Sequence, residues 1–430
     1  MSSFENVSRR KFVELFGAGT VAVSGLALGA CGGANNGGSS EASTSAGSAE
    51  ASASASGSGA SSAAGVFKIG GIGPVTGAAA IYGNATKYGA QVAVDEVNAE
   101  GTIAMELNWQ DDEHDPEKSV NAYNTLKDWG MQILVGTTTT GPCVAVSTET
   151  NSDRIFQLTP SASSTDVIGG QEDENGNVTI ARKDNVFQMC FTDPNQGTAS
   201  AKYIHDQNLG TKIAVIYNNS DAYSTGIYNK FQAEAKTLGL EIVSTTTFTD
   251  DSATDFNVQL NDAKDAGADL VFLPIYYTPA SLILTQANAM GFAPKFFGVD
   301  GMDGILSVEG FDTSLAEDVM LLTPFVATAE DDLTKSFVES YKGVASEEPN
   351  QFAADAYDCV KAIAAAVAEA GVTADMDAAS ICESLVQTFT SSSFSYSGLT
   401  GENMSWKDTG EVTKDPKGMV IKNGVYESMD

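Results

Sequence analysis

The chain has 430 residues, of which 56 are acidic and 23 are basic, and its formal net charge at pH 7 is −33. This acidic balance argues against nucleic acid and against an anionic lipid surface as partners. The sequence contains no CxxC motif and no Cys/His cluster at metal spacing, so no structural metal site is expected.

The N-terminus has the pattern of an export and anchoring signal. Arg9 and Arg10 precede an apolar stretch from Phe12 to Ala30, and small residues lead into Cys31. The pattern predicts a twin-arginine signal peptide over residues 1–30 and lipidation of Cys31. The alternative is a transmembrane anchor, but the stretch is short and interrupted by glycines. We expect the mature chain on the outer face of the cytoplasmic membrane, held only by its lipid.

A tether is predicted next, over residues 31–65. This segment is almost entirely Gly, Ala, Ser and Asn and has no aromatic or large aliphatic residue before Val66. Such a composition cannot bury enough apolar surface to order itself. The remaining residues are too many for one ordinary domain and predict two lobes.

The body of the chain alternates apolar runs with helical patterns. The apolar runs predict strands of parallel sheets; they are Phe67–Gly73, Met105–Gln110, Gln132–Gly136, Ile155–Leu158, Lys212–Tyr217, Leu240–Thr247, Leu270–Pro274 and Lys295–Val299. A helix start is predicted where Asp115 precedes Pro116. The acidic, glycine-rich segment from Gly170 to Asn185 is expected to be a solvated surface excursion. The fold class is therefore α/β, with two doubly wound parallel-sheet lobes joined by a hinge.

Polar, hydroxyl-rich segments follow these strands, and ligands of open α/β sheets bind at such strand ends. They include Gly73–Gly83, Thr137–Thr140, Thr159–Ser164, Asn218–Gly226 and Val299–Gly304. Segments of this kind in both halves of the chain predict one cleft between the two lobes.

The order and spacing of these pieces resemble the Leu/Ile/Val-binding proteins, type I periplasmic binding proteins of ABC importers. The resemblance is carried by Ile69–Gly83, Trp109–Val120, Gly136–Pro160, Ser220–Gly226 and Tyr276–Asp300. It implies lobe 1 over residues 66–189 and 324–397, and lobe 2 over residues 190–323 and 398–430. It also implies an ABC permease as partner, no cofactor, and action as a monomer.

The resemblance further implies residues that bind the head of an amino acid. Thr140 matches a hydroxyl ligand, Ala162 and Ser163 match a backbone carbonyl and donors to the carboxylate, and Asp300 matches the acid that pairs with the ammonium. A zwitterion leaving water needs an anion for its ammonium and N–H or O–H donors for its carboxylate. On sequence alone Asp300 is equally well a turn acid in a DG pair, and the hydroxyl residues are equally well helix caps.

Three tyrosines match positions that line the side-chain pocket and close over the ligand: Tyr82, Tyr223 and Tyr276. Pattern alone favours plain packing for them. Paired cysteines of the family would lie at His114 and Thr139 here, so the Thr137–Thr140 turn must be held in another way. His114 and His205 are expected at the surface or at helix caps.

Enzymatic function is not expected. The early glycines do not form GxGxxG, no GxSxG elbow is present, and the acidic runs lack EF-hand spacing. The sequence thus predicts a lipoprotein that binds a small amino acid, branched-chain or related, for an ABC importer. A sensory module for a membrane receptor, or the same fold binding an amide, urea or an aromatic acid, stays open.

Overall fold

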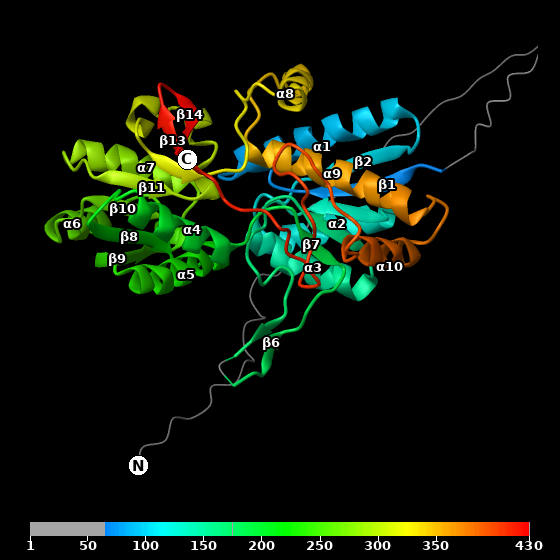
Figure 1. The fold of residues 1–430 in the computed structure, drawn as a ribbon, viewed down its shortest axis with the longest axis horizontal. Helices are drawn as coiled ribbons and strands as arrows, with labels where there is room; N and C mark the ends of the chain where they lie inside the picture. The colour runs from blue at the N-terminus through cyan, green and yellow to red at the C-terminus, as the bar shows by residue number, and fades with distance from the viewer. Residues whose placement is uncertain (1–64, 174, 430) are drawn as a thin grey trace, which may run out of the picture. The chain divides into compact units, whose positions relative to one another are not determined.

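The computed structural model describes residues 65–173 and 175–429. The predicted signal peptide, Cys31 and nearly all of the predicted tether lie outside the described residues. Two large sheets organise the described part (Figure 1). We call the five-stranded sheet and its helices lobe 1, and the seven-stranded sheet and its helices lobe 2.

The lobe 1 sheet is entirely parallel. Its strands in spatial order are β2 (Met105–Gln110), β1 (Phe67–Ile72), β3 (Ile133–Gly136), β4 (Phe156–Thr159) and β7 (Val186–Gln188). Two groups of helices cover it: α1 (Ala80–Glu100), α8 (Asp332–Ala345), α9 (Gln351–Ala370) and α10 (Ala378–Phe389) on one face, and α2 (Pro116–Trp129) and α3 (Thr140–Asp153) on the other. A parallel sheet buried on both faces explains why its strands are uninterrupted apolar runs.

The lobe 2 sheet is parallel with an antiparallel edge. Its strands in order are β9 (Glu241–Phe248), β8 (Lys212–Asn218), β10 (Leu270–Leu273), β11 (Lys295–Gly298), β12 (Met320–Leu322), β13 (Gly418–Lys422) and β14 (Val425–Ser428). The last two strands pair antiparallel. Its helices are α4 (Asp193–Asp206) and α5 (Ala222–Leu238), which pack together, and α6 (Asn257–Asp265) and α7 (Tyr277–Ala289). Short 3₁₀ turns η1 (Asp250–Ser252), η2 (Asp300–Met302), η3 (Ile305–Ser307) and η4 (Thr313–Ala316) complete it.

The predicted fold class is confirmed, and all eight predicted strands are present with ends within one residue of the prediction. The short buried strands β7 and β12 escaped prediction because three residues are too few to show a pattern. The helix start at Pro116 is confirmed, since the Asp115 carboxylate accepts from the amides of Glu117 and Lys118 at 2.8 and 2.9 Å.

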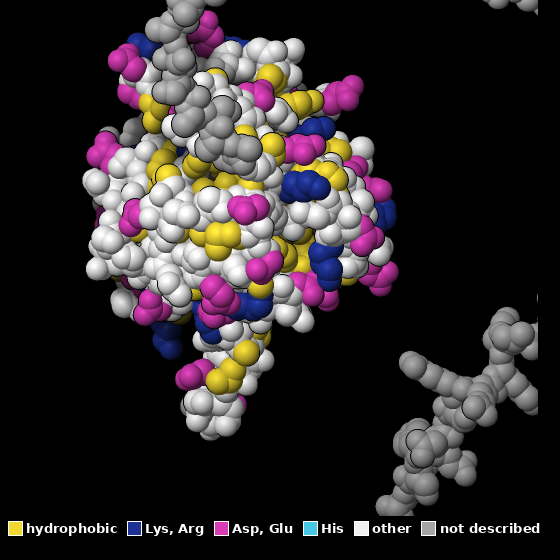
Figure 2. All heavy atoms as spheres, turned by 90° about the vertical axis from the view of Figure 1, so that its right-hand side faces the viewer, with side chains coloured by type: hydrophobic (Ala, Val, Ile, Leu, Met, Phe, Trp, Pro, Cys, Tyr) yellow, Lys and Arg dark blue, Asp and Glu magenta, His cyan; other side chains and the backbone are white. Residues whose placement is uncertain are grey.

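The segment expected to be a solvated excursion contains a small hairpin of β5 (Gln171–Glu172) and β6 (Val178–Ile180). It projects away from lobe 1 at the bottom of Figures 1 and 2, and acidic side chains are spread over the face that Figure 2 shows. Val178 is 63% exposed. The excursion is therefore solvated as expected, but it is built as a hairpin and not as an irregular loop.

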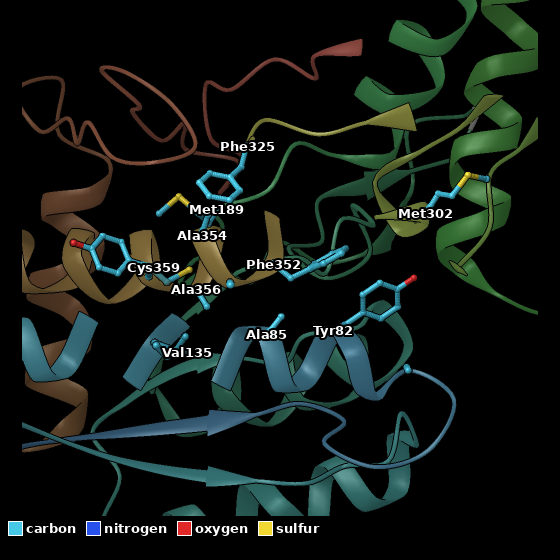
Figure 3. Packing of buried hydrophobic residues seen from close by; sticks show 14 of the residues in the cluster. Tyr82, Ala85, Val135, Met189, Met302, Phe325, Phe352, Ala354, Ala356 and Cys359 are labelled. Carbon is cyan, nitrogen blue, oxygen red and sulfur yellow. The ribbon is translucent and has the colours of Figure 1, made fainter. Parts of the chain in front are cut away.

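The core of lobe 1 lies where α1 crosses α9. Gly89 makes this close contact possible, because a Cβ there would come within 2.0 Å of the Ala353 carbonyl oxygen. Ala356 of α9 lies on the side of that helix that faces Ala85 of α1, and Tyr82 and Phe352 extend this packing toward Met302 of lobe 2 (Figure 3). One continuous apolar cluster thus joins the two lobes.

Three segments connect the lobes: β7 to α4, β12 to α8, and the chain after α10. In the third, Leu399 donates to Asp358, the Trp406 indole donates to the Gln188 carbonyl, and Lys414 pairs with Asp355 at 2.6 Å. These contacts hold residues 399–414 against lobe 1. The predicted change of lobe at residue 398 stays a prediction, and they favour a later crossing just before Gly418.

Four cysteines lie among the described residues, and all four are buried free thiols: Cys143, Cys190, Cys359 and Cys382. The described residues include no helix that is both long enough and apolar enough to cross a membrane.

Candidate functional site

A small cavity lies between the lobes at the strand ends. Its lining comes from seven strand-end or helix-start segments and consists of Tyr82, Thr138, Thr139, Ser161, Tyr223, Tyr276, Asp300, Gly301 and Phe352. The free space is about 10 Å³, roughly that of one water molecule. In this conformation the side chains of the two lobes nearly fill the space between them.

Asp300 is the buried acid of this cavity. It opens η2 directly after β11, and it is 3% exposed. Its carboxylate accepts from the Tyr223 hydroxyl at 2.6 Å, and its amide donates to the Gln196 side chain at 3.1 Å. Burial raises the pKa of Asp300 to about 7, although hydrogen bonds from Tyr223, Gln196 and Gly301 oppose the shift. No Lys or Arg is among the lining residues, so a cationic ligand group would find an acid without a competing partner.

Position 301 must be glycine because the Tyr223 side chain comes too close to the backbone there to leave room for a Cβ. A Cβ there would lie 2.5 Å from the Tyr223 hydroxyl oxygen. That hydroxyl also accepts from the Gly301 amide at 2.9 Å. In the sequence Asp300 and Gly301 look like an ordinary turn pair. In the structure the backbone at these two residues packs directly against the Tyr223 hydroxyl.

Aromatic rings form much of the cavity wall. Tyr223 and Tyr276 stack with ring centroids 4.7 Å apart and planes 5° from parallel, and Tyr82 tilts against Tyr276 at 5.5 Å. The ring of Phe352 meets Tyr82 edge-on, with ring centroids 4.6 Å apart; Figure 3 shows the two side chains next to each other. Burial raises the pKa of each of the three tyrosines well above its usual value. Their hydroxyls therefore stay neutral and can both donate and accept.

Hydrogen bonds join the lobes beside the cavity. The Tyr82 hydroxyl of lobe 1 donates to the Gly301 carbonyl and accepts from the Tyr277 amide. The Tyr277 hydroxyl accepts from the Ile81 amide at 3.2 Å, and Thr278 donates to the Ala78 carbonyl at 2.8 Å. Tyr82 thus lies at the contact between the lobes as well as in the cavity wall.

The groups predicted to hold the ligand head on the lobe 1 side do not line this cavity. Thr140 opens α3, and its hydroxyl is buried without a hydrogen-bond partner among the described residues. The Ala162 carbonyl accepts from Gln188 at 2.8 Å. The Ser163 carbonyl accepts from the Asp193 amide at 3.0 Å, and its hydroxyl accepts from Gln196 at 3.4 Å.

Hydroxyl residues next to the predicted ones face the cavity instead. They are Thr138, Thr139 and Ser161, and Ser161 donates to the Thr138 carbonyl at 2.6 Å. The sequence pointed to the segments that contain them but not to these residues. Phe352 was missed entirely, because nothing in its local sequence distinguishes it from a core residue of α9.

His114 differs from the expectation that it lies at the surface or caps a helix. It is half-buried, and its Nδ1 lies 2.8 Å from the Thr139 hydroxyl oxygen. Its ring meets Tyr276 edge-on at 5.6 Å. The two positions that match the family's paired cysteines are therefore joined by a hydrogen bond, which helps to hold the Thr137–Thr140 turn. His205, by contrast, is exposed at the end of α4, as expected.

A larger cavity of about 280 Å³ lies near the hinge, lined by residues that include Ile81, Asp303, Phe325, Tyr341 and Tyr426. Its most buried acid is already engaged, since Asp303 accepts from the Gln351 amide and the Tyr426 hydroxyl at 3.0 and 2.8 Å. The smaller cavity is the stronger candidate because its acid retains free acceptor capacity. Within residues 65–173 and 175–429, no cluster of three or more His, Cys, Asp and Glu side chains is arranged to hold a metal ion.

Comparison with known proteins decides the family. Residues 66–424 match the family described as periplasmic binding protein. The chain belongs to this family. It is a family of solute-binding proteins and not of enzymes, as the sequence predicted, and its members work outside the cytoplasm.

Three similar proteins illustrate the relationship. The Leu/Ile/Val-binding protein homolog 3 of Brucella melitensis is 28% identical over 311 residues, which cover 71% of this chain and 80% of the relative. The branched-chain amino acid binding protein LivJ of Streptococcus pneumoniae, solved with isoleucine, is 27% identical, with a TM-score of 0.72 over 85% of this chain and 98% of its own. A binding protein from R. palustris, solved with benzoate, shares the fold at 18% identity and a TM-score of 0.72, covering 85% of this chain and 96% of its own.

Proposed function

We propose that this protein is a solute-binding lipoprotein that captures a small amino acid, branched-chain or related, and delivers it to the permease of an ABC importer. The main support for an amino-acid ligand is that Asp300 is a buried acid with no cation beside it in the interlobe cavity. A buried carboxylate is stable when it is paired, and an α-ammonium group is a suitable partner. The branched-chain amino acids named for the Brucella melitensis relative and for LivJ support the same class, whereas the R. palustris protein was solved with benzoate.

The proposed ligand lies between Asp300 and the hydroxyl-rich turns of lobe 1. The lobes must separate to admit it, because the cavity has room for about one water molecule. Direct contacts such as the hydrogen bonds of Tyr82 then reform around the ligand. A ligand that contacts both lobes favours the closed form by its higher affinity for that form.

Isothermal calorimetry with a panel of amino acids, amides, urea and aromatic acids tests the ligand class. We expect at least one of leucine, isoleucine, valine and their small relatives to bind. Binding of an amide or an aromatic acid with no response from any free α-amino acid contradicts the proposal. In that case Asp300 accepts from an uncharged donor or is itself neutral.

The proposed membrane anchor depends on Cys31. Replacing Cys31 by Ser removes the thiol that would carry the lipid, so the variant should leave the membrane fraction while the parent chain stays in it. Incorporation of labelled fatty acid provides the direct measurement. A Cys31→Ser variant that stays in the membrane fraction contradicts lipid anchoring.

Transport separates the importer role from the sensory alternative. Deletion of the protein should abolish uptake of the ligand identified by calorimetry. If uptake is unchanged but a ligand-dependent signalling response is lost, the protein serves a receptor and not a permease.

A further inference from the structure

The larger cavity near the hinge, which we call the hinge cavity, is built by both lobes and by the chain that connects them. Ile81 of α1 and Tyr341 of α8 come from lobe 1, and Tyr426 of β14 comes from lobe 2. Phe325 lies in the connection from β12 to α8. The volume of about 280 Å³ is close to the lower limit of small-molecule sites, which is roughly 300 Å³. The hinge cavity is therefore large enough for a compact organic molecule.

Aromatic rings form the buried part of its wall. Phe325 and Tyr341 are 3% and 1% exposed, and the ring of Phe337 packs on both, with centroids 5.9 and 5.7 Å from theirs. Tyr426 is held in place because its hydroxyl donates to Asp303 at 2.8 Å. These fixed rings offer an apolar body a large contact area, and the electron-rich faces of such rings attract cations.

The charged residues of the lining are all acidic. They are Asp303, Glu347 and Glu348, and the lining includes no Lys, Arg or His. Asp303 is already engaged by two hydrogen bonds, and Glu348 pairs with Lys342 at 2.5 Å. Burial raises the pKa of Glu347, and no cation or hydrogen bond within the described part of the chain opposes the shift. Glu347 is therefore the acid that is left to pair with a ligand.

We propose that the hinge cavity binds a small organic cation whose ammonium lies at Glu347 and whose apolar body packs on the three aromatic rings, Phe325, Tyr341 and Tyr426. The all-acidic lining favours a positive charge, and the rings add cation–π attraction. The predicted tether does not supply such a group, because residues 32–65 contain no Lys, Arg or aromatic residue. The site is separate from the interlobe cavity, since the two cavities share no lining residue.

Occupation of the hinge cavity should favour closure of the lobes. Its two walls meet where Asp303 accepts from the Gln351 amide at 3.0 Å. They also meet at Gly304, where a Cβ would lie 2.9 Å from a methyl carbon of Ile81. A molecule that touches both walls binds this arrangement more tightly than an open one, and by linkage it raises the affinity for a ligand of the interlobe cavity. This consequence, unlike the site itself, rests on the proposed amino-acid ligand.

Phenethylamine is the probe, and an NMR titration measures its dissociation constant. The amine should bind the parent protein more tightly than 2-phenylethanol, which has the same ring and no charge. Glu347→Gln should weaken amine binding roughly two- to fivefold, the range of a partly exposed ion pair. Glu339→Gln, a change at an exposed acid of α8 outside the lining, should not.

A second pair of variants tests the cavity itself. Val425→Trp places a large ring in the lining and should obstruct binding of the amine, whereas Val344→Trp, at an equally exposed residue outside the lining, should not. Asp300→Asn shows whether the amine enters the interlobe cavity instead. Amine binding that is lost in Asp300→Asn and kept in Glu347→Gln overturns the inference.

Leucine binding separates this inference from the proposed function. Saturating phenethylamine should raise the leucine affinity of the parent protein roughly fivefold; an unchanged or lowered affinity overturns the link to closure. If no amino acid binds but the amine binds and depends on Glu347 and Val425, the site stands and the amino-acid proposal fails. If leucine binds but the amine does not, or if Glu347→Gln and Glu339→Gln bind the amine equally well, the site is overturned and the amino-acid proposal stands.

Discussion

The two sides of the interlobe cavity use their polar groups differently. On the lobe 2 side, Tyr223 and Asp300 present side chains to the cavity and bond to each other. On the lobe 1 side, the predicted Ala162 and Ser163 bond within the protein, while Thr138, Thr139 and Ser161 face the cavity. The resemblance pointed to the lobe 2 side chains that line the cavity, whereas on the lobe 1 side the hydroxyl and backbone groups that face it depend on which way a turn points them.

Substitution on the lobe 2 side of the cavity should give the largest loss of leucine affinity. Replacing Asp300 by Asn removes the anion while it preserves the shape of the side chain, so the ligand ammonium loses its partner. Leucine affinity should fall by about 3 to 5 kcal/mol, on the order of a hundred- to a few thousand-fold. Calorimetry measures this loss of affinity. The control is Asp251→Asn, since Asp251 is an exposed acid of lobe 2. Unchanged affinity in Asp300→Asn means that the anchor lies elsewhere.

Low pH should weaken leucine binding for the same reason. Burial raises the pKa of Asp300 to about 7, so the ionised form that pairs with an ammonium is present above that pH and is lost as the pH falls through it. Between about pH 7 and pH 5, affinity should drop by up to roughly tenfold per unit. A titration of the leucine dissociation constant checks this, and Asp300→Asn should flatten the profile. A flat profile for the parent protein contradicts the role of Asp300.

The contact between the lobes is tested by Tyr82→Phe. The change leaves the Gly301 carbonyl and the Tyr277 amide without the hydroxyl that now bonds both. Unsatisfied buried groups cost about 1 to 3 kcal/mol, so affinity should fall roughly five- to a hundredfold because the closed form is less favoured. Tyr88→Phe, on the same helix but packed on Tyr341, is the control. Small-angle scattering should show less compaction on adding leucine; equal compaction in both variants would refute this role.

The smallest effect is expected at the lobe 1 turn. His114→Ala removes the hydrogen bond to Thr139, whose net contribution is about 0.5 to 1.5 kcal/mol, so affinity should fall by roughly two- to tenfold. His205→Ala, at the exposed end of α4, should have no effect. If both histidine variants bind equally well, the turn is held by other bonds, such as the one from Ser161 to Thr138.

Much of the architecture was predictable because its determinants are local. The strand from Leu270 to Leu273 is a run of apolar residues, and Asp115 with Pro116 marks the start of a helix wherever it occurs. Short pieces were not predictable. β12 has only three residues, and it is a strand because it pairs with β11 and β13.

The sequence by itself determined the α/β alternation and the segments that end at the cleft. These follow from residue type and spacing along the chain. Only the tertiary structure decided that Phe352 joins the wall and that His114 meets Thr139. Each of these depends on segments distant in sequence packing together, and burial and hydrogen bonding are set by neighbours that no local pattern specifies.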